Sequence, residues 1–205
     1  MFTISSKWTA VRLIAGAMLC LVILALGLTP RAVASEWDKK TIVTFNVPLE
    51  IPGKVLPPGT YVFKRLDSAA DHNIVQIFDK DEKQLYATVL AIPDYRLQPA
   101  DKPIIQFEER PSNSPPAIKA WFYPGDEYGL QLVYTNDRAR ALAKRTNQNV
   151  LSMRNEMGQN ITASANSANA PSVRALEKAE VTAMNPSGQQ VGMEQAASTK
   201  PTSSH

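Results

Sequence analysis

Three acidic residues at the ends of strand-like runs, Asp94, Glu108 and Asp126, have the chemistry that acid–base catalysis needs. Two carboxyl groups that face one cavity at about 5–10 Å would suit hydrolysis of a glycosidic bond. Nothing in their spacing brings the three together, and Glu109 points to the opposite face of an extended strand from Glu108. We therefore expect Asp94 and Asp126 to cap their own turns. We expect a protein that is not an enzyme, with a carboxylate-based hydrolase as the third hypothesis.

Other catalytic and metal-binding chemistries lack the residues that they need. Outside the last residue, His205, the chain has one histidine, His72, which lies in a loop-like segment. The acidic run that begins at Asp79 resembles the start of a calcium loop but has no glycine at the sixth position and no glutamate at the twelfth. The only cysteine is Cys20. We therefore expect no catalytic residue, metal or cofactor.

An aromatic hairpin is the alternative source of function. The stretch 120–134 holds five of the chain's fifteen aromatic residues, and Pro124-Gly125-Asp126 has the composition of a turn between two strands. On the first strand, period-two alternation places Ile118, Ala120 and Phe122 on one face, which we expect to face the core.

The opposite face of this strand is the candidate binding site. Lys119, Trp121 and Tyr123 share it, and Tyr128 follows just beyond the turn. Large rings with a polar group suit a platform for a small ligand or a sugar ring. The competing interpretation is that a second layer covers this face, because large aromatic side chains are buried on average.

Strand-like runs recur along most of the chain and predict an all-β fold. Leu85–Ile92 is apolar at nearly every position, so we place it centrally in its sheet and covered on both faces, ending at Pro93. The proline-rich segment 48–59 allows little regular structure except at an edge. We predict a sandwich or barrel of about seven to eight mostly antiparallel strands. The predicted strands are 41–47, 61–66, 74–78, 84–92, 104–110, 118–123 and 128–134.

One short helix is predicted near the end of this β-rich domain, which we assign to residues 37–153. Thr135-Asn136-Asp137 has N-cap chemistry for a helix over Asn136–Arg145. Its apolar face is narrow, so we expect it to lie over a sheet edge. Val150–Met153 is either a last strand or a docked segment.

Residues 158–205 differ from the rest in composition. They contain no aromatic residue and are rich in Ala, Ser, Asn, Thr and Gln. We predict a disordered tail, because such a segment buries too little apolar area to offset its ordering entropy. Within it, Pro171–Met184 has apolar residues on one helical face and predicts a marginal helix.

Residues 1–34 have the layout of a secretory signal peptide. Two basic residues precede an apolar run of 16 residues, Leu13–Leu28, and Ala32-Val33-Ala34 follows. The run is shorter than the about 20 residues of a spanning helix. We favour cleavage after Ala34 and export to the periplasm or beyond, with an uncleaved membrane anchor as the alternative.

The formal net charge of +3 resides in this leader. Residues 1–34 hold three basic and no acidic residues, whereas residues 35–145 hold fifteen of each and residues 146–205 four of each. A neutral chain has no electrostatic attraction for phosphate backbones or anionic lipid. We therefore expect no nucleic-acid partner, and a membrane contact only through an uncleaved leader.

Six stretches carry a resemblance to a known family: 47–58, 59–64, 73–78, 87–96, 107–111 and 119–126, the last of which reads Lys-Ala-Trp-Phe-Tyr-Pro-Gly-Asp. Over about Phe45 to Met153 the chain resembles an uncharacterised family of exported bacterial β-rich proteins. The resemblance implies export and a compact β domain, and it transfers no catalytic residue. The leading hypothesis is an exported non-catalytic domain that makes protein or envelope contacts. The alternative is a small-ligand or glycan-binding module that uses the aromatic face.

Overall fold

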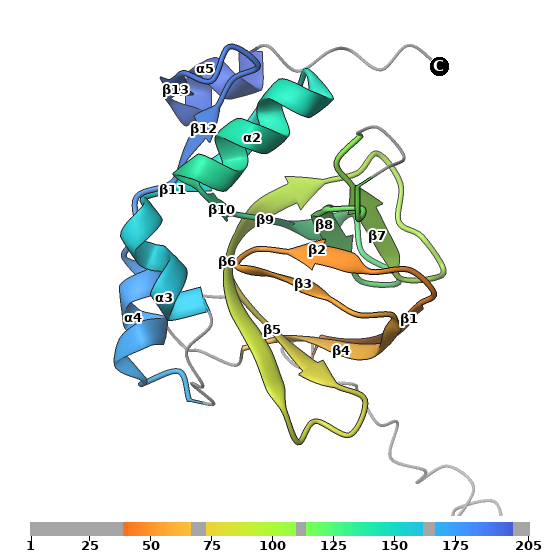
Figure 1. Cartoon of the computed structure of the whole chain (residues 1–205). Coiled ribbons are helices and arrows are strands. Elements are labelled where there is room, and N and C mark those ends of the chain that lie inside the picture. The colour runs from red at the N-terminus through yellow and green to blue at the C-terminus, as the bar shows by residue number, and fades with distance from the viewer. Residues whose placement is uncertain (1–38, 67–72, 110–113, 162–166, 199–205) are drawn as a thin grey trace, which may run out of the picture. The chain divides into compact units, whose positions relative to one another are not determined.

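The computed structural model describes most of the chain after residue 38 (Figure 1). The chain divides into two compact units, Met1–Ser35 and Glu36–His205, and every described element belongs to the second. The predicted signal peptide lies outside the described residues. No helix in the described part is both long and apolar enough to cross a membrane. The described ranges are 39–66, 73–109, 114–161 and 167–198.

A seven-stranded sheet in which all neighbours are antiparallel dominates this unit, as the mostly β prediction requires. Its two β-hairpins β5–β6 and β8–β9 are those that the alternation predicted. The edge strands are β1 and β7. In sheet order the strands are β1 (Lys40–Phe45), β4 (Gly59–Arg65), β5 (Ile74–Asp79), β6 (Leu85–Tyr95), β9 (Tyr128–Leu132), β8 (Ile118–Phe122) and β7 (Ile104–Phe107).

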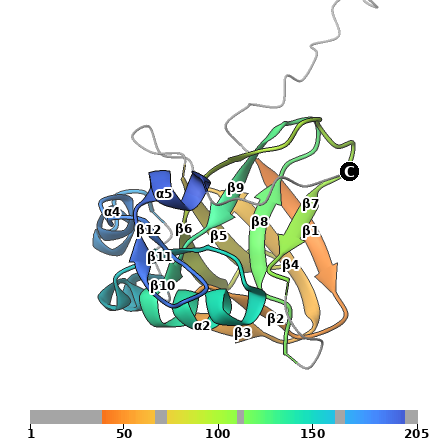
Figure 2. The same cartoon turned by 90° about the horizontal axis from the view of Figure 1, so that it is seen from above.

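The sheet curls until its two ends meet around one apolar core. The ring of Phe63 on β4 lies 6.2 Å from that of Trp121 on β8, and Phe45 on β1 lies 6.4 Å from Phe107 on β7. Figure 2 shows the two edge strands side by side. The prediction left two alternatives, a sandwich or a barrel. The observed arrangement is a single curled sheet that has two edges.

The central position predicted for β6 is confirmed. It is the fourth of the seven strands, and Ala87–Ala91 are all buried. The predicted end at Pro93 is wrong, because β6 continues to Tyr95 and Pro93 pairs with Leu130 of β9. The pairing with β5 stops at Leu90, so this part of β6 has an edge, where proline is tolerated.

The proline-rich segment 48–59 forms more structure than predicted. Strands β2 (Leu49–Ile51) and β3 (Lys54–Leu56) make a short hairpin whose turn uses Gly53 at φ 86°, a conformation that favours glycine. Figure 1 shows the hairpin beside the curled sheet. Its apolar side chains belong to the main core cluster, so the hairpin contributes to that core: Leu49, Ile51 and Leu56.

Glu50 anchors the same hairpin to the C-terminal part of the unit. Its carboxylate is buried and accepts hydrogen bonds from Nε and Nη2 of Arg138. The hydrogen bond to Glu50 raises the pKa of the Arg138 guanidinium, which stays charged. A two-pronged contact of this kind fixes orientation as well as distance.

The predicted helix is α2 (Asn136–Thr146), and it packs on a small second sheet. It buries the predicted face of Ala139, Leu142 and Ala143. Val150–Met153 forms a strand, β11, which resolves the two alternatives for that segment. In order, the small sheet consists of β10 (Tyr134–Thr135), β11, β12 (Thr182–Met184) and β13 (Gln190–Val191).

The disordered tail predicted for 158–205 is corrected in its described part. Ile161, Val173 and Leu176 are fully buried in the main core cluster, and their helices lie against β6. Composition describes this segment in isolation, whereas in the fold its few apolar residues lie on helix faces that pack against β6. The elements are η1 (Asn155–Met157), α3 (Gly158–Ile161), α4 (Pro171–Glu177) and α5 (Met193–Ser198).

Candidate functional site

A cavity of about 440 Å³ lies between the curled sheet and the small C-terminal sheet. Ile92 of β6 and Gln131 of β9 are register partners that line it. The adjacent pair, Ala91 and Leu132, belongs to the core cluster on the other face, so the cavity opens on the outer face of the curled sheet. The lining residues are Ile92, Lys119, Gln131, Asn147, Gln148, Asn149, Leu151, Ala183, Asn185, Pro186, Val191, Met193, Gln195 and Ala196.

The composition of the lining is unusual, and we name the site the carboxamide cavity. Each of its six carboxamide side chains offers hydrogen-bond donors and an acceptor. Lys119 is its one cation, and no carboxylate is among these described lining residues. The remaining side chains are aliphatic or Met and form an apolar surface. The carboxamides are Gln131, Asn147, Gln148, Asn149, Asn185 and Gln195.

A shift in strand register brings Lys119 to this cavity. The pairing of β7 with β8 slips by one residue at Phe107, and Lys119 is the extra residue on β8. An inserted residue breaks the alternation of side chains between the two faces. As a result Ile118 and Trp121 share the main core cluster, and Lys119 lines the cavity with Gln131. The predicted common face of Lys119 and Trp121 is therefore wrong.

The turn after α2 supplies three neighbouring carboxamides, at 147–149. Asn147 caps the helix in the left-handed conformation, at φ 56° and ψ 31°, which asparagine tolerates better than most residues. The side-chain Nδ2 of Asn149 then donates to the carbonyl oxygen of Ala196 at 3.1 Å. This hydrogen bond joins the turn at 147–149 to α5 and fixes the relative position of these two walls of the cavity.

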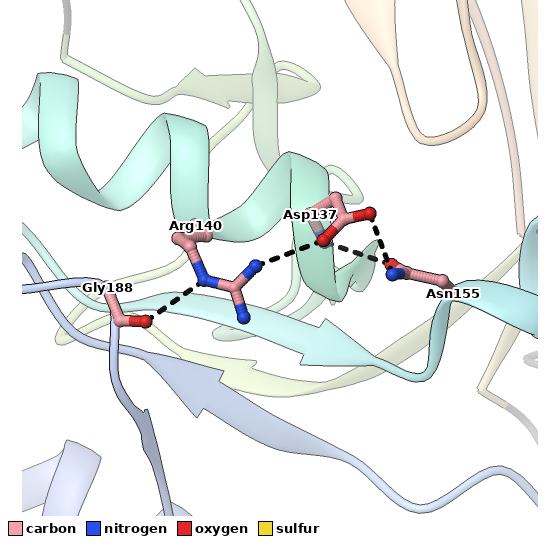
Figure 3. A network of polar contacts seen from close by, with 4 residues as sticks. All are labelled: Asp137, Arg140, Asn155 and Gly188. Atoms are coloured by element: carbon pink, nitrogen blue, oxygen red, sulfur yellow. Dashed lines mark hydrogen bonds and ion pairs between the residues drawn. The ribbon is translucent and has the colours of Figure 1, made fainter.

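A polar network fixes the third wall, the turn between β12 and β13 (Figure 3). Arg140 of α2 donates from Nε to the carbonyl oxygen of Gly188 at 3.1 Å and from Nη1 to Asp137 Oδ1 at 3.0 Å. Asn155 donates to the other Asp137 oxygen at 2.8 Å. This network positions the turn that contributes Asn185 to the cavity.

Lys119 is a half-buried cation in the described part of the chain, and it has no ion pair there. Its Nζ lies 3.4 Å from Oε1 of Gln148, at the long limit for a hydrogen bond. Gln148 in turn donates to Glu109 Oε2 at 3.4 Å, and Glu109 does not line the cavity. The described lining residues therefore carry one formal positive charge, that of Lys119.

Trp121, the centre of the predicted platform, is core, as the competing interpretation expected. Its side chain is 2% exposed, its ring contacts Phe63, and its Nε1 donates to Thr41 Oγ1 at 3.1 Å. The face is covered because the sheet curls and brings β1 and β4 over β8. A ligand cannot stack on this ring without opening the core.

Tyr123 and Tyr128 instead surround a cation of the same chain. The ammonium of Lys39 lies 5.7 Å from the Tyr123 ring centre and 5.8 Å from that of Tyr128. It also forms an ion pair with Asp126 in the β8–β9 turn. We name this group the Lys39 cage. Of the four predicted binding residues, Trp121, Tyr123 and Tyr128 line one hollow of about 10 Å³, whereas Lys119 lines the carboxamide cavity. A hollow of this size holds at most about one water molecule.

The three candidate catalytic carboxylates also lie apart from the cavity, because none of them lines it. Asp94 is on β6, where its Oδ1 accepts from the amide of Tyr95. Glu108 is 4% exposed beside β7, and Asp126 holds Lys39. Within the described ranges, no group of three or more His, Cys, Asp or Glu residues could hold a metal ion.

Sequence reasoning missed the carboxamides. The run Asn147-Gln148-Asn149, directly after a predicted helix, was an available signal. Asn185 and Gln195 fall in the segment predicted to be disordered, for which composition predicts no binding site. Comparisons of the chain with protein-family models, curated proteins and solved structures found no match.

Proposed function

We propose that the chain is an exported, non-catalytic binding module whose ligand site is the carboxamide cavity. The observation that carries this proposal is the concentration of six carboxamides, one cation and an apolar surface around about 440 Å³. Cavities of about 300–1,000 Å³ that combine apolar lining with a few polar groups are typical of small-molecule sites. Export rests on the leader at residues 1–34.

The way the cavity is built supports binding. Its walls come from two sheets and α5, and they are cross-linked by the Asn149–Ala196 bond and by the network around Arg140. A site with fixed walls loses little conformational entropy when a ligand enters. Since the lining has carboxamides where a hydrolase needs carboxylates, we assign it to recognition.

This site limits the partners that a module for protein or envelope contacts could bind. A cavity of this size accepts a small molecule or the end of a larger one, so the partner presents a compact group to it. The aromatic platform that the sequence suggested is replaced by the cavity, and Lys119 is the one predicted binding residue that belongs to it.

The experiment is a fragment titration of the purified chain followed by amide chemical shifts. We expect polar fragments to shift the signals of residues 147–149 and 183–196 at millimolar concentration. Val191→Phe places a ring in the cavity and should abolish these shifts. Val55→Phe, on the exposed surface of β3, is the matched control. The proposal fails if no fragment binds, or if Val191→Phe binds as the original chain does.

A further inference from the structure

We infer that the carboxamide cavity binds the carboxyl-terminal end of a short peptide, with the terminal carboxylate at Lys119 and the peptide groups at the carboxamides. This inference rests on the proposed function, because it names the chemical class of ligand for the same site. An aliphatic terminal side chain would lie on the apolar part of the lining, near Ile92, Leu151 and Met193.

The charge of the lining favours an anionic ligand. Lys119 is half-buried and has no ion pair in the described part of the chain, and none of the lining residues is acidic. A partly buried cation is stabilised by an anion that forms a charge-assisted hydrogen bond with it. The site therefore favours a ligand with one negative group and disfavours a cation.

A single lysine distinguishes between the common anions. A phosphate monoester carries about −1.5 to −2 charges and is usually held by several cations or backbone amides. The carboxamide cavity has one cation among its lining residues, so its charge matches a carboxylate. We therefore assign the anionic group as a carboxylate.

The neutral part of the lining favours a peptide over a sugar acid. A peptide unit has one donor and one acceptor, and a carboxamide side chain can satisfy both. The apolar lining residues are aliphatic or Met, and no aromatic ring is among them. A sugar ring would be expected to use a flat aromatic surface, whereas an aliphatic side chain fits this lining.

An open strand edge beside the cavity agrees with a peptide. In the described small sheet β13 is the terminal strand, with β12 as its one neighbour. Val191 of β13 lines the cavity, and a Cβ atom on the adjacent Gly192 would meet no atom of the described residues within 4 Å. Because β13 has no second neighbour in the described small sheet, an extended chain can bind by adding to its edge.

The test compares three probes by calorimetry on the purified chain: N-acetyl-alanyl-leucine, its carboxyl-terminal amide, and glucuronate as the sugar acid. We expect the peptide acid to bind about tenfold more tightly than the amide, because the amide loses the charge-assisted bond. Lys119→Met should reduce the affinity for the acid to that for the amide. Lys80→Met, on the exposed β5–β6 bend, is the matched control and should leave the difference intact.

The outcomes separate this inference from the function on which it rests. Equal affinity for acid and amide, or tighter binding of glucuronate, would overturn the peptide carboxylate while fragment binding in the cavity still stood. Failure of all three probes would also overturn it. Lys119→Gln provides a second variant that keeps a polar group, and it should lose the preference for the acid just as Lys119→Met does. Persistence of that preference in both variants would exclude Lys119 as the carboxylate partner.

Discussion

The indole nitrogen of Trp121 donates a hydrogen bond to Thr41 Oγ1 at 3.1 Å, between residues 80 positions apart in the chain. Trp121 is on β8 and Thr41 is on the edge strand β1. Both side chains are buried, at 2% and 3% exposure. The bond therefore joins two distant strands of the sheet across the core, and it satisfies a donor that water cannot reach.

Thr41→Val tests how much the Trp121–Thr41 hydrogen bond contributes to the stability of the fold. The substitution keeps the shape but leaves the indole N–H unsatisfied, which should lower the free energy of unfolding by about 1–3 kcal/mol. Urea unfolding followed by tryptophan fluorescence measures the change. Thr44→Val, on the same strand, removes an exposed Thr44–Thr60 hydroxyl contact and should change stability by less than about 0.5 kcal/mol. Equal effects would show that the indole bond adds nothing specific.

The Lys39 cage should contribute to stability through its cation. Lys39→Met removes the ion pair with Asp126 and the contacts with two tyrosine rings, and we expect a loss of about 1–2 kcal/mol. Lys39→Arg should retain most of it. The matched control is Lys40→Met, because the Lys40 side chain is 40% exposed against 13% for Lys39. If thermal unfolding gave the same midpoint for both methionine variants, the cage would have no stabilising role.

Replacement of Gly129 by any residue with a side chain should destabilise the fold. A Cβ atom at this position would overlap the ring of Phe122. The Arg96 guanidinium also packs on this ring, with its Cζ 5.4 Å from the ring centre. Gly129→Ala should therefore destabilise the fold by about 3 kcal/mol. Gly192→Ala is the control, because a Cβ there meets no atom of the described residues within 4 Å, and it should change the free energy of unfolding by no more than about 0.5 kcal/mol. Adding Phe122→Leu to Gly129→Ala should recover part of the loss, and an additive double variant would contradict the proposed overlap.

Leu176 distinguishes an ordered C-terminal segment from a disordered tail. It is fully buried with Val173 in the main core. Leu176→Ala should therefore lower the free energy of unfolding by about 2–5 kcal/mol, measured in the same urea transition that unfolds the sheet. Arg174→Ala on the exposed side of α4 is the control and should be close to neutral. A Leu176→Ala variant with unchanged stability would mean that α4 does not pack against the sheet in solution.

Strands and α2 could be predicted because their signals are local. Alternation, turn residues and the continuous apolar run of β6 each act over a few neighbouring positions. Burial of 49–56 and of α4 could not be predicted in this way, because the residues that cover them lie far away in the chain. Composition describes a segment by itself, and Leu176 is ordered by β6.

The sequence predicted one residue of the candidate site, Lys119, but on an incorrect assignment of its strand face. Alternation along β8 predicts that Lys119 shares a strand face with Trp121, but a one-residue register shift places Lys119 on the other face. Such a shift depends on pairing with β7 and leaves no mark in the alternation of β8. The carboxamides that surround Lys119 come from 131, 147–149, 185 and 195, and only tertiary structure brings them together.

Tyr61 should make stability depend on pH at the alkaline end. Burial, and next the neighbouring Tyr86, raise the pKa of the Tyr61 phenol above its ordinary value of 10.0, and the hydroxyl donates to the carbonyl oxygen of Pro57 at 2.6 Å. A pKa that is higher in the folded than in the unfolded state gives stability that is complete below about pH 10 and is lost as the pH rises through the folded value. Tyr61→Phe should therefore be less stable than the original chain by about 1 kcal/mol near neutral pH, with the difference shrinking above about pH 10. Urea unfolding across this range measures it, with the exposed Tyr95→Phe as control; a difference that stays constant with pH would show that Tyr61 titrates alike in both states.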